Sequence, residues 1–272
     1  MINLKRKISD KFIHVQVDES LFLSYNKIFE SFFSSFERVT NFIYGGFRIT
    51  DKVDDKNAYY CNIEDAKWVF KLMNALEEYY ATTLNCTVIH GGIINMMQTI
   101  IAIIGKRMSG KSTLINYLID CEDAMFLTDD CIYIVDNKCY GFNIPISIRN
   151  SKQSFKSVIC TTIDDENIER VLVYPEKRIN SIKAIDYMLF PCYDTESMEM
   201  KVERIENSKL FNYFFTNIRH MQNVKSLFDD VIQILRNVNA YVIRYSKCEQ
   251  VNEWLNYSFI NKPHLTSLER KQ

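Results

Sequence analysis

Glycine and proline are scarce in this chain, which has 7 glycines and 4 prolines among 272 residues. So few prolines exclude a long proline-rich linker, and an apolar content of 47% excludes a chain too polar to fold. The formal net charge is only −1, so no overall charge attracts the protein to nucleic acid or to a membrane. The composition predicts a compact globular protein without nucleic-acid or membrane partners.

The chain also lacks the residue spacings of disulfide-rich, zinc-binding or serine-hydrolase proteins. Its eight cysteines are irregularly spaced without a C-x-x-C pair, and H-E-x-x-H is absent. No apolar segment of a signal peptide follows the basic start. The most apolar stretch, 88–104, contains His90, Asn95 and Gln98, so it predicts two core strands rather than a membrane span. We therefore expect reduced, mostly buried thiols and a cytoplasmic protein.

Two of the rare glycines lie in one motif, residues 105–112, which fits the P-loop (Walker A) pattern G-x-x-x-x-G-K-[ST]. An apolar run predicts a buried strand over 99–104, and a helix is predicted over 111–120. Backbone N–H groups at the start of such a helix bind phosphate oxygens. The alternative, an ordinary glycine turn before a helix, fits the flanking pattern less well. The predicted nucleotide contacts are Gly105, Lys106, Arg107, Met108, Ser109, Gly110, Lys111, Ser112 and Thr113.

Two adjacent carboxylates, Asp129 and Asp130, follow the apolar strand predicted over 125–127. One of them would hold Mg²⁺, and the other would orient an attacking hydroxyl and accept its proton. The alternative is a solvated acidic turn at the end of a strand. Further along, Arg149 is interpreted as a surface arginine rather than a substrate contact, and 164–166 as a solvated acidic loop.

The pattern of elements predicts an α/β protein with three parts. Residues 1–85 would form a small N-terminal α+β lobe, 86–260 a P-loop domain, and 261–272 a polar tail. A stripe of apolar residues from Val69 to Leu84 predicts a helix over 63–84 that joins the lobe to the domain. The other predicted elements are a strand over 12–17, a helix over 25–36, a hairpin over 41–50, strands over 86–97, 131–135, 171–174, 182–190 and 241–245, and helices near 210–215, 224–235 and 251–255.

Together, His90-Gly91, the strand pair, the 105–112 loop and Asp129-Asp130 resemble the catalytic core of HPr serine kinase/phosphorylase. The chain looks more similar still to the HPr kinase-like proteins, some of which modify a precursor peptide. The resemblance covers about residues 86–150 and extends more loosely over 180–256. It implies a P-loop fold akin to phosphoenolpyruvate carboxykinase, with ATP and Mg²⁺ as cofactors. It also implies that the acceptor is a serine on a peptide or small protein, and that the protein could assemble as a homo-oligomer.

The resemblance also implies roles for individual residues. Lys111 would bind the outer phosphates, Ser112 and Asp130 would hold Mg²⁺, and Asp129 would be the catalytic base. His90 matches a histidine that lies close to the transferred phosphate in the family. A histidine before a pair of glycines could equally hydrogen-bond a turn, and the sequence favours neither interpretation.

Departures from the family pattern affect the expected activity. Met108 stands where the family has a glycine, which restricts the backbone if that position needs a positive φ. Thr113 replaces an acidic residue, and no glycine follows Gly141. These differences argue against HPr itself as the acceptor and against reverse phosphorolysis. They also motivate an alternative function, a nucleotide-binding regulatory or assembly protein that has lost transfer, with a plain NTPase as a third possibility.

Overall fold

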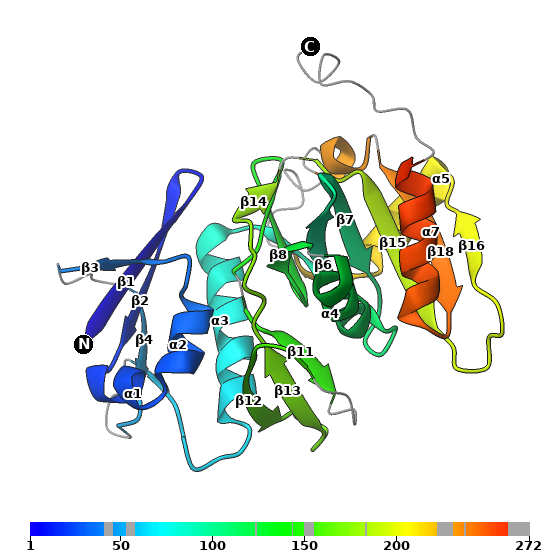
Figure 1. Cartoon of the computed structure of the whole chain (residues 1–272). Coiled ribbons are helices and arrows are strands. Elements are labelled where there is room, and N and C mark those ends of the chain that lie inside the picture. Colours follow the sequence, from blue (N-terminus) through cyan, green and yellow to red (C-terminus); the bar gives the residue numbers. More distant parts are fainter. Residues whose placement is uncertain are drawn as a thin grey trace.

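The computed structural model describes residues 1–40, 46–52, 58–122, 124–142, 144–149, 155–182, 184–221, 231–236 and 238–260. Within these residues the chain forms a mixed α/β structure with three sheets (Figure 1). Among the same residues, no helix is both long and apolar enough to cross a membrane. All eight cysteines are free, as expected, but only four of them are buried; three are half-buried, and Cys121 is exposed.

The N-terminal sheet has five strands in the order β3-β1-β2-β4-β5. Its strand bounds are β1 Ile2–Ile8, β2 Lys11–Val17, β3 Glu37–Val39, β4 Phe47–Thr50 and β5 Tyr59–Tyr60. β2 confirms the predicted strand over 12–17. Part of the predicted 41–50 hairpin lies outside the described residues, and β4 pairs in parallel with β2 and β5.

The helix predicted over 25–36 is shorter than expected and is preceded by another. The structure has α1 at Glu19–Ser24 and α2 at Asn26–Phe32, followed by β3. Ser34 and Ser35 separate α2 from β3, and serine favours turns over helix interiors because its hydroxyl competes for backbone groups. The 37–39 segment pairs with β1 instead of extending the helix.

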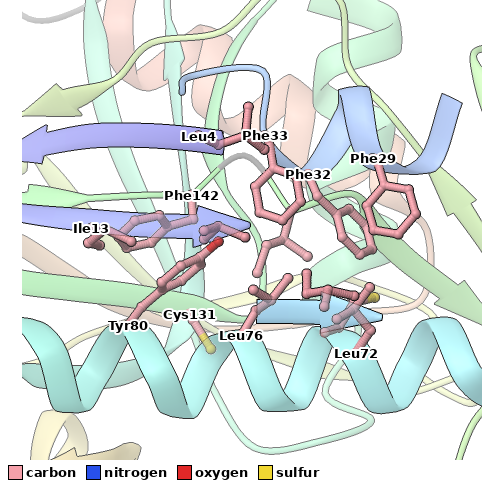
Figure 2. Packing of buried hydrophobic residues seen from close by; sticks show 14 of the residues in the cluster. Leu4, Ile13, Phe29, Phe32, Phe33, Leu72, Leu76, Tyr80, Cys131 and Phe142 are labelled. Atoms are coloured by element: carbon pink, nitrogen blue, oxygen red, sulfur yellow. The ribbon is translucent and has the colours of Figure 1, made fainter. Parts of the chain in front are cut away.

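Helix α3, Trp68–Leu84, forms the base of the first hydrophobic core (Figure 2). The helix begins later than the predicted residue 63, but all members of its predicted apolar stripe are buried. It ends at Asn85 in the left-handed conformation. Tyr80 stacks on Phe142, a residue from much later in the chain, with ring centroids 3.9 Å apart. Cys131 belongs to the same cluster, so this core joins the N-terminal sheet to the central part of the chain. The domain boundary after residue 85 stays a prediction.

The largest sheet has ten strands, with the order β14-β10-β9-β6-β7-β15-β18-β16 and with β8 and β17 paired to β6. At its centre, β7, β15 and β18 run parallel, while β6 is antiparallel to β7. The strand bounds are β6 Thr87–Met96, β7 Thr99–Ile104, β8 Met125–Thr128, β9 Cys131–Val135, β10 Lys138–Tyr140, β14 Ser181–Ile182, β15 Tyr187–Tyr193, β16 Lys201–Arg204, β17 Ile218–Met221 and β18 Asn239–Tyr245.

The strand predicted over 182–190 is confirmed only over 187–190, because the segment divides into β14 and β15 at separate places in this sheet. Asp186 marks the start of β15. Its carboxylate accepts a hydrogen bond from the backbone N–H of Ile100 at 2.8 Å, and its own N–H donates to the carbonyl of Ile100 at 3.0 Å. These bonds fix the strand beside β7, and a sequence pattern of apolar residues does not reveal them.

Helices cover both faces of the large sheet. α4, Lys111–Glu122, and α7, Cys248–Ile260, pack on one face, and Figure 1 shows them side by side in front of the strands. α5, Asn207–Phe215, and the helical residues 231–235 pack on the other face. The predicted 224–230 segment and the 261–272 tail lie outside the described residues. A three-stranded sheet, β11 Ile146–Arg149, β12 Val158–Ile163 and β13 Glu169–Val173, lies beside α4 and α3.

Candidate functional site

Loop 105–112 connects β7 to α4, as the sequence predicts, and two of its residues have positive φ. Gly110 has φ +93°, and Met108 has φ +69° with its side chain 69% exposed. This position requires the left-handed conformation, which glycine adopts without strain. Met108 meets that requirement at a cost of about 1–2 kcal/mol, because its Cβ crowds the following carbonyl.

Hydrogen bonds hold loop 105–112 at the carboxyl ends of the parallel strands. Tyr193, the last residue of β15, donates its N–H to the carbonyl of Ser109 at 3.2 Å. Tyr245, the last residue of β18, donates its hydroxyl to the carbonyl of Gly110 at 3.3 Å. Ligands of open α/β sheets bind outside these strand ends, so the loop lies where a ligand site is expected.

Lys111 begins α4 and is almost fully buried. Its Nζ donates to the carbonyl of Lys106 within the loop at 3.0 Å. Burial lowers the pKa of Lys111, although the charges of Asp129 and Asp130 act in the opposite direction. The lysine is therefore folded over its own loop, close to both predicted carboxylates.

Asp129 lies at the end of β8 and is 4% exposed. The hydroxyl of Ser112 hydrogen-bonds to its carboxyl group, whereas Oδ1 has no hydrogen-bond partner among the described residues. Burial, together with the charge of Asp130, raises the pKa of Asp129 to about 6. A buried carboxylate with an unpartnered oxygen is costly, so this group indicates a site built for a ligand or a proton.

Asp130 faces different partners. Its Oδ1 lies 2.9 Å from Nε2 of His90 and 3.1 Å from Nη2 of Arg219, and its backbone has φ +73°. Although burial alone would raise the pKa of Asp130, the His90 hydrogen bond and the Arg219 charge hold it well below its usual range. The structure thus places Ser112 beside Asp129, and His90 beside Asp130. The predicted pairing of Ser112 with Asp130 around Mg²⁺ stays a prediction.

Sequence reasoning missed two residues of this site, Arg219 on β17 and Glu77 on α3. Nη1 of Arg219 lies 2.9 Å and 3.1 Å from the two carboxylate oxygens of Glu77 and 3.3 Å from Sγ of Cys131. Neither residue belongs to a motif, and pairing of β17 with β6 brings Arg219 to the site. The ligand atoms of Glu77, Asp130 and Cys131 lie close enough together for a metal, but the Arg219 guanidinium already supplies the positive charge there.

A cavity of about 410 Å³ opens between the loop, the two aspartates and helix α3. One face of α3 lines it with Phe70, Met73, Asn74 and Glu77, at helical spacing. The loop side contributes Met108, Gly110, Lys111, Ser112 and Thr113, and the small sheet contributes Ile148, Arg149 and Arg170. The predicted residues Lys111, Ser112, Asp129, Asp130 and His90 all line this one cavity.

The prediction of a solvated loop over 164–166 is wrong for Asp164, which is fully buried. Its carboxylate lies 2.8 Å from Nη2 of Arg170 and 3.0 Å from Nη2 of Arg107, and it accepts N–H bonds from Glu166 and Ile168. Arg107 also pairs with Glu166 at 2.9 Å. The loop arginine is therefore bound to this acidic turn, and it also lines the cavity. Its predicted contact with the nucleotide stays a prediction.

Arg149 has features of both interpretations, the favoured surface arginine and the substrate contact. It lies on β11 with its side chain 35% exposed, as a surface arginine would. It also lines the cavity and lies 3.4 Å from Glu166. Sequence position alone could not distinguish a cavity wall from outer surface, because the small sheet borders both.

Asp164→Asn is expected to lower the free energy of unfolding by about 3 kcal/mol at pH 7, since Arg170 would lose its buried anion. Burial alone would raise the pKa of Asp164, but hydrogen bonds from Ile168 and Arg170 hold it below its ordinary value. The stabilisation is thus present above the ordinary pKa of about 4 and is lost as pH falls below it. Urea unfolding at pH 7 and pH 3 should show the difference shrinking at the lower pH.

Asp165→Asn is the matched control, because Asp165 is the exposed neighbour in the same turn. It should change the unfolding free energy by less than about 0.5 kcal/mol at either pH. Equal effects of the two substitutions at pH 7 would contradict the assigned role of Asp164.

Comparisons with known proteins show no family for this chain. No family model matches it, and no curated protein matches it. The solved structure of the Hpr(Ser) kinase/phosphatase from Coxiella burnetii is similar over 64% of this chain and 94% of that one, with 14% sequence identity and a TM-score of 0.28. A likeness this distant supports no conclusion about activity, so the function is argued from the site itself.

Proposed function

We propose that the protein is a P-loop kinase of the HPr kinase-like type, which transfers the γ-phosphoryl group of ATP to a serine on a peptide or small protein. The observation that carries the proposal is the position of Asp129. This carboxylate has one unpartnered oxygen, contacts Ser112, and lies near Lys111 at the start of a helix that follows a glycine loop. Few arrangements other than a phosphate site explain a buried acid, a buried lysine and a helix N-terminus together.

The residues of the site fit both proposed cofactors. Hydroxyl and carboxylate oxygens are ligands that Mg²⁺ prefers, and Ser112 and the acids 129–130 offer them in one cavity. At Gly110 an added Cβ would lie 2.5 Å from the hydroxyl of Tyr245, so only glycine lets the loop pack this closely against the end of β18. When bound, Mg²⁺ neutralises charge on the phosphate oxygens.

The residues of the chain would then carry the reaction as follows. The serine Oγ forms a bond to the γ-phosphorus, the bond from that phosphorus to the bridging oxygen breaks, and ADP leaves with the electron pair. Asp129 accepts the hydroxyl proton, for which a pKa of about 6 is suited near neutral pH. Lys111 and Arg219 place positive charge beside the γ-phosphoryl group during its transfer, and His90 holds Asp130.

The alternative function, a nucleotide-binding regulator without transfer activity, is supported by the loop sequence. Met108 holds a left-handed conformation that glycine would adopt without strain, and Thr113 replaces an acidic residue at the start of α4. Neither feature removes Lys111, Ser112 or Asp129 from the cavity. We therefore favour the kinase.

Incubation of the protein with γ-labelled ATP, Mg²⁺ and candidate peptides encoded near its gene tests the proposal. We expect label on serine of one acceptor, and calorimetry should show binding of a non-hydrolysable ATP analogue with Mg²⁺. Binding without label on any acceptor would support the regulator, and release of labelled phosphate to water alone would support an NTPase. Absence of nucleotide binding would contradict both the kinase and its alternatives.

A further inference from the structure

Helix α3 of the N-terminal lobe reaches the site through Glu77. We infer that Glu77 is a positioning residue. It holds the Arg219 guanidinium in the orientation in which this guanidinium also binds Asp130 and fixes its position. This inference rests on the proposed phosphoryl transfer. It gives a residue of the N-terminal lobe a part in that reaction. Apart from the face of α3 that lines the cavity, the lobe has no assigned role.

The contacts form a continuous chain across the cavity wall. Nη1 of Arg219 is held by both oxygens of Glu77, at 2.9 Å and 3.1 Å, and Nη2 contacts Asp130 at 3.1 Å. His90 contacts the same oxygen of Asp130, Oδ1, at 2.9 Å. Because a guanidinium is planar and its donors have fixed directions, holding one nitrogen fixes the direction of the other.

Glu77 is itself fixed in place by the core. It is 9% exposed, and on the same helix Leu76 and Tyr80 are fully buried in the first hydrophobic cluster (Figure 2 shows both). A carboxylate this buried needs a charged partner, since an unpaired one is strongly destabilising. Arg219 meets that need while its side chain remains 30% exposed at the cavity.

The position of Asp130 matters for its neighbour. Asp130 has φ +73°, a conformation that a residue other than glycine keeps only when its surroundings hold it. Its carbonyl accepts the N–H of Gly91 at 3.3 Å, and its side chain is held by His90 and Arg219. Loss of the Arg219 contact would relax this turn and move Asp129, which lies one residue away. Misplacement of a reacting group by about 1 Å can cost about 100-fold in rate.

The test uses three variants of the full chain. Glu77→Gln removes the charge but keeps the size, Glu77→Asp keeps the charge on a shorter side chain, and Glu78→Gln is the control at the exposed next residue of α3. We expect Glu77→Gln to lower kcat by about 10- to 100-fold while the KM for ATP stays within about twofold, because loop 105–112 is untouched. Glu77→Asp should recover part of the loss, and Glu78→Gln should match the unaltered protein.

A second readout does not depend on activity. In an arginine-selective NMR spectrum, the Nη hydrogens of Arg219 should give separate signals, because contacts on both sides slow rotation of the guanidinium. Arg219→Lys identifies these signals. We expect Glu77→Gln to abolish them and Glu78→Gln to keep them.

The two readouts separate failure of this inference from failure of the proposed function. If the unaltered protein transfers no phosphate to any acceptor, the kinase proposal fails, and the Arg219 signals still show whether Glu77 holds the guanidinium. Retained signals or unchanged kcat in Glu77→Gln would overturn the inference. If Glu77→Gln does not fold, as circular dichroism would show, the same comparison is made with Glu77→Asp, and a kcat equal to that of the unaltered protein together with unchanged Arg219 signals would overturn it.

Discussion

Asp129→Asn is expected to make the nucleotide-free protein more stable at neutral pH while it abolishes phosphoryl transfer. The gain should be about 1–2 kcal/mol in the free energy of unfolding. The loss of transfer should be at least about 100-fold, because asparagine cannot accept the serine proton. Replacing a catalytic residue often stabilises the protein, because the buried charge of that residue serves the reaction and not the fold.

The sign of the stability change follows from the pKa of Asp129, which burial and the charge of Asp130 raise to about 6. Between the ordinary value of about 4 and pH 6, the folded state binds more protons than the unfolded state, so this group makes stability fall as pH rises. Complete removal of the Asp129 charge at pH 7 would raise the free energy of unfolding by about 3 kcal/mol. The asparagine brings an amide donor to the position where Oδ1 has no partner, which reduces the gain.

The adjacent carboxylate supplies a control of opposite sign. Because contacts with His90 and Arg219 hold the pKa of Asp130 low, its ionised form stabilises the fold, and Asp130→Asn should be destabilising at pH 7. Urea unfolding in the presence of a chelator, at pH 7.5 and pH 4, measures both variants. The gain in Asp129→Asn should vanish at pH 4. A destabilised Asp129→Asn at pH 7.5, or one that still transfers phosphate, would contradict the role of Asp129.

Features encoded by local sequence could be predicted. The 105–112 loop, the strand before it and the helix after it are specified by neighbouring residues, and the structure has them where the sequence placed them. The apolar stripe of α3 follows from helical periodicity alone. Likewise, the loop sequence predicts that a positive φ would strain Met108, and the structure gives this residue φ +69°.

Features that depend on distant pairing could not be predicted. Arg219 and Glu77 are 142 residues apart in the chain, and Arg107 and Asp164 are 57 apart. In each case the sequence shows charged residues outside any motif pairing, which are most often solvated. Only the packing of α3, β17 and the small sheet shows which charges meet. The interpretation of 164–166 as a solvated loop is wrong for this reason. Burial of Asp164 depends on two arginines outside the run, Arg107 and Arg170.

Gly110→Ala is expected to remove nucleotide binding and to lower the free energy of unfolding by about 2–4 kcal/mol. Gly110 has φ +93°, a conformation that alanine rarely adopts. Its new Cβ would also lie 2.5 Å from the hydroxyl of Tyr245 and 3.0 Å from Cβ of Tyr193. The loop would have to move away from the ends of β15 and β18, and its N–H groups would no longer converge on a phosphate.

Tyr245→Phe separates the two causes of that loss. This substitution removes the oxygen that the new Cβ would meet, together with a 3.3 Å hydrogen bond to the Gly110 carbonyl, so alone it should cost only about 1 kcal/mol. In the Gly110→Ala, Tyr245→Phe double variant the clash with the hydroxyl is absent but the backbone strain remains. The loss of unfolding free energy in the double variant should therefore be smaller than the sum of the two single losses by about 1 kcal/mol.

Calorimetry with the ATP analogue should still show no binding, because the φ of residue 110 sets the direction of the loop N–H groups. Additive stability effects would show that the hydroxyl does not limit residue 110, and nucleotide binding by Gly110→Ala would place the phosphates elsewhere.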